Sequence, residues 1–127
     1  MPFHFTNHYT RDEVRSLLPQ IRGWLEKLRA SLAEVAKYEK RITGLLAPGQ
    51  DLGGEMVNRW VKAVVAVEQL FAEFSKREIQ IKDVDRGLLD FPAIIGGREV
   101  FLCWEQDDDD IEFWHELDSG FAGREPL

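Results

Sequence analysis

The chain has 127 residues with 44% hydrophobic and 11% aromatic content, which suffices for one packed domain but not for two independent cores. Its 16 basic and 23 acidic residues give a formal net charge of -7, which argues against nucleic acid and anionic membranes as partners. A single cysteine excludes an intramolecular disulfide, so we expect a cytoplasmic protein. The longest apolar run, Ala63–Val67, is far shorter than the ~20 residues of a membrane span, and no membrane association is predicted.

The first predicted element is a long helix over residues 11–46. Thr10 followed by Glu13 matches a capping box, in which two side chains bind free amides at the start of a helix. Apolar residues then recur at alternating spacings of four and three as far as Leu45, which gives the helix one apolar face. Pro19 falls inside this pattern, and we expect it to bend the helix rather than end it.

A second helix is predicted over residues 54–77, after the break at Pro48–Gly49. Further apolar positions, such as Trp24, Trp60 and Val65, widen both helical stripes beyond the narrow seam that two helices alone can bury. We therefore expect a long antiparallel, coiled-coil-like helical hairpin that forms a homodimer through its helices. The alternative is that the sheet covers these apolar positions.

Residues 88–117 predict a small β-meander of three antiparallel strands. Its segments 88–95, 99–104 and 111–117 are short and rich in aromatic and β-branched residues, and they are separated by Gly96–Gly97 and by the acidic run Asp107–Asp110. With residues 118–127 as a tail, the sequence predicts an α+β fold in a single domain over residues 1–127.

The turns set the predicted strand register. A two-residue turn at Gly96–Gly97 pairs Asp90 with Cys103, and a turn on the acidic run pairs Leu102 with His115. The core face is then predicted to hold Leu89, Phe91, Ala93, Val100, Leu102, Trp104, Phe113, His115 and Leu117. The opposite face is too apolar for a solvated surface, so we expect the tail or a partner protein to cover part of it.

Four segments of the chain resemble a known family: TRDEVRSLLPQIR near the start, then IKDVDRGLLDFPA, GREVFLCW and FWHELDSGFAGREPL. Together they span nearly the whole chain, which is similar to a bacterial family catalogued as domain of unknown function 2203. The resemblance implies a small cytoplasmic protein with a helical hairpin and a C-terminal β segment, and it implies no activity. The chain departs from the family at Glu105–Asp110, where the family tends to have a Gly-Glu turn.

His115 is the strongest candidate for catalysis or metal binding, because imidazole titrates near neutral pH and is a common metal ligand. The alternative is a core histidine satisfied by one hydrogen bond. A helix carboxylate, from Glu13, Glu55 or Glu68, could reach it. A metal site needs three or four ligands and His115 is the one predicted here, so a divalent metal is compatible with the sequence but not required by it.

Cys103 and His115 could act as a nucleophile and its base, or as two metal ligands. The predicted register places them on opposite faces, so we expect Cys103 to be a packed thiol; a slip of one residue would align the pair. Asp90 lies across from Cys103, and we expect it to bind backbone amides or an arginine.

The acidic run Asp107–Asp110 could attract Ca²⁺ or Mg²⁺, but it lacks the spacing of an EF-hand loop, and a solvated turn is the preferred interpretation. In the tail, we expect Phe121 to be an anchor and Arg124 to bind a carboxylate or an anionic ligand.

Two functions are therefore predicted. The first is a non-enzymatic interaction or scaffold module that self-associates through its helices or docks another protein. The second is a metal- or small-ligand-binding protein whose site could support hydrolysis. The predicted ligand-binding residues of this second function are Asp90, Arg98, His115, Asp118 and Arg124.

Overall fold

The computed structural model describes residues 2–46 and 54–127. It divides into two compact units, of which the first comprises Met1–Leu25 with Glu73–Leu127 and the second comprises Glu26–Ala72. The first unit holds the sheet and the second holds the greater part of both helices. That the two units form the single domain expected from the length of the chain stays a prediction.

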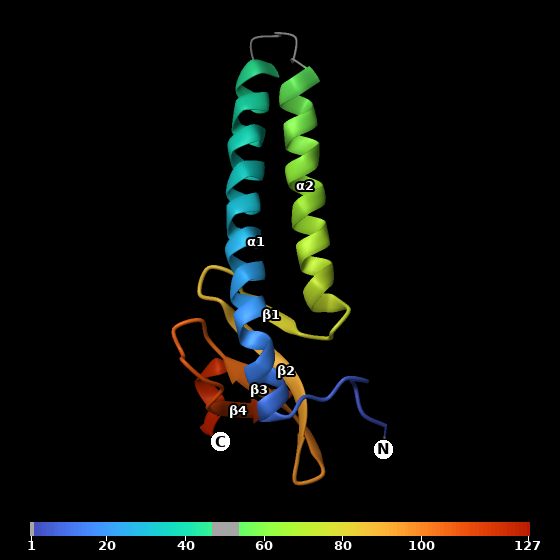
Figure 1. Cartoon of the computed structure of the whole chain (residues 1–127), viewed down its shortest axis with the longest axis vertical. Coiled ribbons are helices and arrows are strands. Elements are labelled where there is room, and N and C mark those ends of the chain that lie inside the picture. The colour runs from blue at the N-terminus through green and yellow to red at the C-terminus, as the bar shows by residue number, and fades with distance from the viewer. Residues whose placement is uncertain (1, 47–53) are drawn as a thin grey trace. The chain divides into compact units, whose positions relative to one another are not determined.

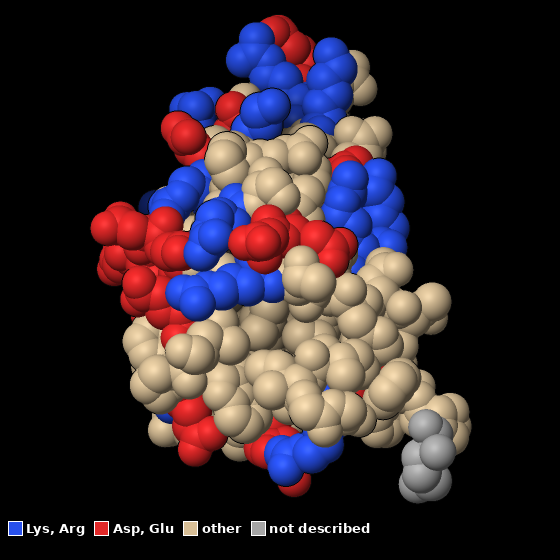
Figure 2. Space-filling model, turned by 60° about the horizontal axis from the view of Figure 1, so that its bottom comes forward, with Lys and Arg blue, Asp and Glu red and all other residues tan. Residues whose placement is uncertain are grey.

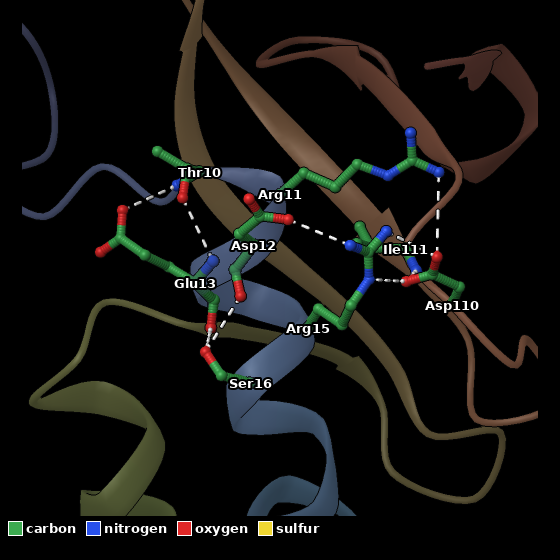
Figure 3. A network of polar contacts seen from close by, with 8 residues as sticks. All are labelled: Thr10, Arg11, Asp12, Glu13, Arg15, Ser16, Asp110 and Ile111. Atoms are coloured by element: carbon green, nitrogen blue, oxygen red, sulfur yellow. Dashed lines mark hydrogen bonds and ion pairs between the residues drawn. The ribbon is translucent and has the colours of Figure 1, made fainter.

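Helix α1 spans Arg11–Leu46, the predicted bounds, and continues through Pro19. Its start is a capping box, as predicted: the Thr10 amide donates to Glu13 Oε1 and the Glu13 amide donates to Thr10 Oγ1, both at 3.1 Å (Figure 3). These bonds satisfy two amides that lack partners within the helix. The bend expected at Pro19 stays a prediction.

Helix α2 spans Gly54–Ser75 and ends two residues before the predicted end. The Ile79 amide donates to the Phe74 carbonyl at 3.1 Å and the Glu78 amide to the Ser75 carbonyl at 3.0 Å, which closes the helix as a Schellman motif. Glu78 takes the left-handed conformation with φ 60° in place of the usual glycine, so the sequence contains no signal for this end. The predicted break at Pro48–Gly49 lies outside the described residues.

In the second unit, side chains of the two helices touch. Trp60 Nε1 donates to Glu39 Oε1 at 3.4 Å, and Tyr38 and Ala63 are buried. The coiled-coil-like hairpin itself stays a prediction. Within the described ranges, neither helix combines the length and the apolar character needed to cross a bilayer.

The sheet has five antiparallel strands in sequence order, so the α+β class is confirmed and the count of three strands is wrong. The strands are β1 (Gln80–Asp83), β2 (Leu88–Ile95), β3 (Arg98–Trp104), β4 (Phe113–Glu116) and β5 (Glu125–Pro126). The two unpredicted strands, β1 and β5, lie at the sheet edges. They are too short and too polar for alternation to mark them.

The register is as predicted between β2 and β3, where Asp90 lies opposite Cys103 across a turn with φ 58° and 78° at Gly96 and Gly97. Between β3 and β4 the predicted register is wrong by one residue, because His115 lies opposite Phe101 rather than Leu102. The connection here is a loop rather than a tight turn, so its length does not set the register. Counting from the acidic run therefore assigned each β4 side chain to the wrong face of the sheet.

The core of the first unit lies between the sheet and the first turns of α1 (Figure 1). Six of the nine residues predicted on the core face of the sheet are buried there, and Trp114 takes the place expected for Phe113 and His115. The buried members are Val14, Leu18, Ile21, Leu25, Phe74, Ile79, Leu89, Phe91, Ala93, Val100, Leu102, Trp104 and Ile111.

The acidic loop before β4 is fixed to α1. Arg15 binds Asp110 with two bonds, Nε to Oδ1 at 2.9 Å and Nη2 to Oδ2 at 2.8 Å (Figure 3). The Arg15 guanidinium lowers the pKa of Asp110 to about 2. Arg22 donates to the backbone carbonyl of Asp108 at 3.0 Å. Asp107 and Asp109 are exposed, so only part of the run is the solvated turn that was predicted.

Two irregular segments cover the other face of the sheet. Residues 4–8, the N-terminal strap, are held by Glu99, whose carboxylate accepts from the His4 amide at 2.7 Å, the Phe5 amide at 3.0 Å and His8 Nε2 at 2.7 Å. In the C-terminal tail, β5 pairs with β4 at the sheet edge, and the short 3₁₀ turn Phe121–Gly123 begins at the cavity wall that also includes Asp90 and Cys103. The tail or a partner protein was expected to cover part of this face; the strap was not.

Charged groups on one face of the molecule are mixed (Figure 2). On the face in Figure 2, basic and acidic side chains lie side by side in a band, next to a broad area without charge. This face shows no continuous basic stripe of the kind that follows a phosphate backbone.

Candidate metal-binding site

Three buried side chains that can bind metal meet on the strap-covered face of the sheet. They are Asp90 on β2, Cys103 on β3 and His115 on β4, which are 2%, 1% and 2% exposed. One ligand atom from each lies within 4.8 Å of the others. No second group of this kind occurs among the described residues.

The strand register produces this meeting. Asp90 is the direct cross-strand partner of Cys103, and His115 faces Phe101, two residues before Cys103 on the same side of β3. Side chains at such diagonal positions are within reach of each other. The prediction that Cys103 and His115 lie on opposite faces is therefore wrong. It followed from the predicted pairing of β3 with β4, which is off by one residue.

Both ring nitrogens of His115 have partners. Nδ1 lies 2.7 Å from the Glu116 carbonyl oxygen, and Nε2 lies 3.0 Å from Asp90 Oδ1. A carbonyl oxygen only accepts, so Nδ1 carries a hydrogen and donates it. A second proton must lie between Nε2 and the carboxyl group, because two bare acceptors would repel each other.

Cys103 is not suited to be a nucleophile. Burial, reinforced by the neighbouring Asp90 carboxyl, raises the pKa of its thiol to about 12. His115 cannot serve as its base, because both ring nitrogens are engaged with Glu116 and Asp90. The nucleophile-and-base hypothesis for this pair therefore loses its physical basis, while the metal-ligand hypothesis gains the geometry that it lacked.

The carboxylate partner of His115 comes from strand β2, on the far side of β3, and not from a helix, as had been considered for Glu13, Glu55 and Glu68. Glu13 instead caps α1. Asp90 was expected to bind backbone amides or an arginine; it binds the imidazole instead.

A cavity of about 240 Å³ lies beside the cluster. Asp90 and Cys103 form part of its wall, and the rest comes from β1, from the start of β2, from Phe101 and from the tail. The buried cluster thus adjoins a space that a small molecule or water can occupy.

Two of the predicted ligand residues stand apart from the cluster. Arg98 is exposed and pairs with Glu116, and Asp118 is exposed in the turn after β4. Neither lines the cavity among the residues described for it.

Arg124, the remaining predicted ligand residue, lies near the cluster without being part of it. Its guanidinium stacks over the Phe113 ring at 4.0 Å and the Phe121 ring at 4.1 Å, and it approaches Asp108 Oδ2 at 3.5 Å. It therefore meets a carboxylate, as expected. Its positive charge also opposes the rise in the pKa of the Cys103 thiol, but a guanidinium group does not serve as a metal ligand. Phe121 is half-buried at this place and forms part of the cavity wall.

The donor set suits a transition metal. A thiolate, an imidazole and a carboxylate are the ligands that zinc prefers, and three protein ligands leave one position for water or substrate. The Nδ1–H bond to the Glu116 carbonyl is the outer hydrogen bond that metal-bound histidines usually make, and it leaves Nε2 for the metal. A zinc ion would replace the shared Asp90–His115 proton and the thiol proton, and the three donors would have to draw closer than 4.8 Å.

A family model described as Uncharacterized conserved protein (DUF2203) matches residues 7–127. The chain belongs to this family. The matched range includes Asp90, Cys103, His115 and the tail. No curated protein matches the chain, and no solved structure matches it.

Proposed function

We propose that this family member binds a divalent transition-metal ion, zinc first of all, through Asp90, Cys103 and His115. The hydrogen bond from His115 Nδ1 to the Glu116 carbonyl carries the proposal, because it orients the ring so that Nε2 faces the other two donors. Buried polar side chains that converge next to a cavity are typical of binding sites.

The position of the cavity supports an open rather than a closed metal site. A three-ligand zinc next to a space for water resembles catalytic sites, in which the metal lowers the pKa of its bound water. Hydrolysis is therefore the chemistry that we propose if the protein is an enzyme. A reducing compartment such as the cytoplasm suits the proposal, since it keeps Cys103 reduced.

Cobalt titration of chelator-treated protein tests the proposal. We expect one Co²⁺ per chain, with a thiolate-to-cobalt charge-transfer band and the visible bands of a four-coordinate ion. The Cys103→Ser variant, which changes one atom, should lose the charge-transfer band, and His115→Gln and Asp90→Asn should weaken binding about 10-fold or more. His4→Gln is the matched control, because His4 is exposed and only its backbone amide has a bond.

Binding without a thiolate band, or binding that Cys103→Ser leaves unchanged, would overturn the proposal. Circular dichroism of each variant separates loss of ligands from loss of the fold. Because serine is nearly the size of cysteine, Cys103→Ser keeps the test decisive even if a His115 variant fails to fold.

A second candidate function is self-association through α2. Val61, Val65 and Phe71 are 44%, 42% and 38% exposed, although each is apolar. Val61 and Val65 are one turn apart and therefore share a face of the helix. We propose that the exposed face with Val61 and Val65 is buried in the homodimer, or in the complex with a protein partner, that the sequence predicts.

Sedimentation velocity tests the second candidate. The Val61→Gln/Val65→Gln variant should be monomeric at concentrations where the unchanged protein is a dimer. The control is Lys62→Gln/Glu68→Gln, which changes two exposed residues of the same helix and leaves the net charge unaltered. A monomer before any substitution would reject the candidate. Nucleic acid is not proposed as a partner, an inference supported by the net charge of -7 and by the mixed charges in Figure 2.

A further inference from the structure

We infer that the cavity beside Asp90 binds a small monoanion with an apolar body, such as an aromatic or branched-chain carboxylate. The inference concerns the cavity and its charge, and it holds for the protein with or without the metal proposed above.

The size of the cavity limits its ligand. Its volume of about 240 Å³ is below the roughly 300–1,000 Å³ of pockets for drug-sized ligands. It therefore fits a compact molecule with one ring or one branched chain, and it excludes nucleotides and peptides of several residues.

The walls of the cavity are mostly apolar. Leu88, Phe101, Leu117 and Phe121 contribute side chains to it, and Leu88 and Phe101 are buried. The Phe121 ring is held between two guanidinium groups, Arg86 at 4.6 Å and Arg124 at 4.1 Å from its centre. These contacts fix the Phe121 wall in place, although it belongs to the tail, and they leave the edge of the ring for contact with the body of a ligand.

The charge of the cavity favours an anion. Lys82 is the only Lys or Arg among the described residues that line it, and its Nζ lies 5.6 Å from the centre of the Phe101 ring. The Asp90 carboxyl does not cancel this charge, because it is engaged by His115 Nε2 at 3.0 Å. Lys82 is therefore the cation that a ligand carboxylate can reach from the cavity.

Metal binding would not alter the role of Lys82. A divalent ion would bring two positive charges, and the Cys103 thiolate and the Asp90 carboxylate would offset both. Lys82 is then still the cation beside the cavity. A single carboxylate matches its charge, whereas a dianion would carry one negative charge in excess.

Calorimetric titration with pairs of isosteric ligands tests the inference. Benzoate is compared with benzamide, and isovalerate with isovaleramide, on both chelator-treated and zinc-loaded protein. At least one carboxylate should bind about fivefold or more tightly than its amide, since bonds to charged groups are stronger than neutral ones. The Lys82→Gln variant should lose this preference and retain the affinity for the amide. Lys76→Gln is the control, because that exposed lysine pairs with Glu73 and does not line the cavity.

Several results would overturn the inference: neither carboxylate binds, the amides bind equally well, or Lys82→Gln keeps the preference. Carboxylate-induced NMR shifts away from Phe101, Leu117 and Phe121 would do the same. Carboxylate binding to protein that takes up no metal would support this inference while rejecting the proposed metal site, so the two failures are distinguishable.

Discussion

The two faces of the sheet are made of alternate residues on the same strands, yet one face buries apolar side chains and the other buries a polar cluster. On β2, Leu89 and Phe91 enter an apolar core beneath α1, whereas Asp90 between them enters a polar cluster next to a cavity. The difference follows from what covers each face. A regular amphipathic helix packs a continuous apolar stripe against the sheet, while irregular segments leave room for polar groups and for a cavity.

The covers are also attached differently. The first turns of α1 contribute Val14, Leu18 and Ile21 to the core, so that cover is held by burial of apolar area. The N-terminal strap is held largely by backbone amides that donate to Glu99 and Glu78. The helix-covered face should therefore carry the stability, and the strap-covered face should carry the function.

The largest effect should come from a core residue. Phe91 is fully buried, and Phe91→Ala should cost about 3–5 kcal/mol in the free energy of unfolding, measured by urea denaturation. Ile94 on the same strand is 38% exposed, and Ile94→Ala should cost less than about 1 kcal/mol. Similar costs at the two positions would contradict the claim that the helix-covered face carries the stability.

The buried pair should show strong coupling. Asp90→Ala or His115→Ala alone should destabilise metal-free protein by about 3 kcal/mol, because each leaves a buried polar partner without its bond. The double variant should cost little more than either single variant. Additive costs in this double-mutant cycle would show that the two side chains do not act as a unit.

The strap should respond to acid locally. Burial by itself would raise the pKa of Glu99, but the bonds from His8 and from the His4 and Phe5 amides outweigh it and lower the pKa. Since the folded-state pKa is depressed, the stabilisation is complete above the unfolded value of about 4.3 and is lost as the pH falls through the lower folded value.

Hydrogen exchange of residues 4–8 measures this response. Glu99→Gln should speed exchange of the His4 and Phe5 amides at neutral pH and leave amides of the core strands unchanged. Glu112→Gln, at an exposed position, is the control. Faster exchange throughout the sheet would mean that the strap is as important to stability as the helix.

The smallest effect concerns the acidic loop. The pKa of Asp110 lies at about 2 chiefly because of Arg15, so Arg15→Gln should raise it toward the ordinary value of about 3.9. Arg11 lies 3.9 Å from the same carboxylate, and Arg11→Gln should raise the pKa by less. A carboxyl-detected NMR titration gives both values. The stabilisation from this pair is present above the unfolded value and disappears as the pH falls through about 2. A larger rise for Arg11→Gln would contradict the geometry.

Local signals predicted much of this fold. The capping box at Thr10 and the three-four spacing placed both helices, and Gly96–Gly97 fixed the register between β2 and β3, because such a turn admits one pairing. Strands β1 and β5 depend on pairing with their neighbours rather than on their own four and two residues, so local patterns could not show them.

The site was predicted only in part, because the predicted pairing of β3 with β4 was wrong by one residue. Asp90 and His115 were predicted separately as ligand residues, while Cys103 was expected to be a packed thiol on the other face. The loop before β4 is held by contacts with Arg15 and Arg22, which are distant in sequence, so its length alone did not set the pairing. Lys82 escaped notice because β1 was not predicted.

X-ray absorption at the zinc edge tests the central claim most directly. For zinc-loaded protein we predict one sulfur ligand at about 2.3 Å and nitrogen or oxygen ligands at about 2.0–2.1 Å. The sulfur contribution should vanish in Cys103→Ser. Coordination by nitrogen and oxygen alone would contradict the assignment to Asp90, Cys103 and His115, as would two sulfur ligands, because one chain has a single cysteine.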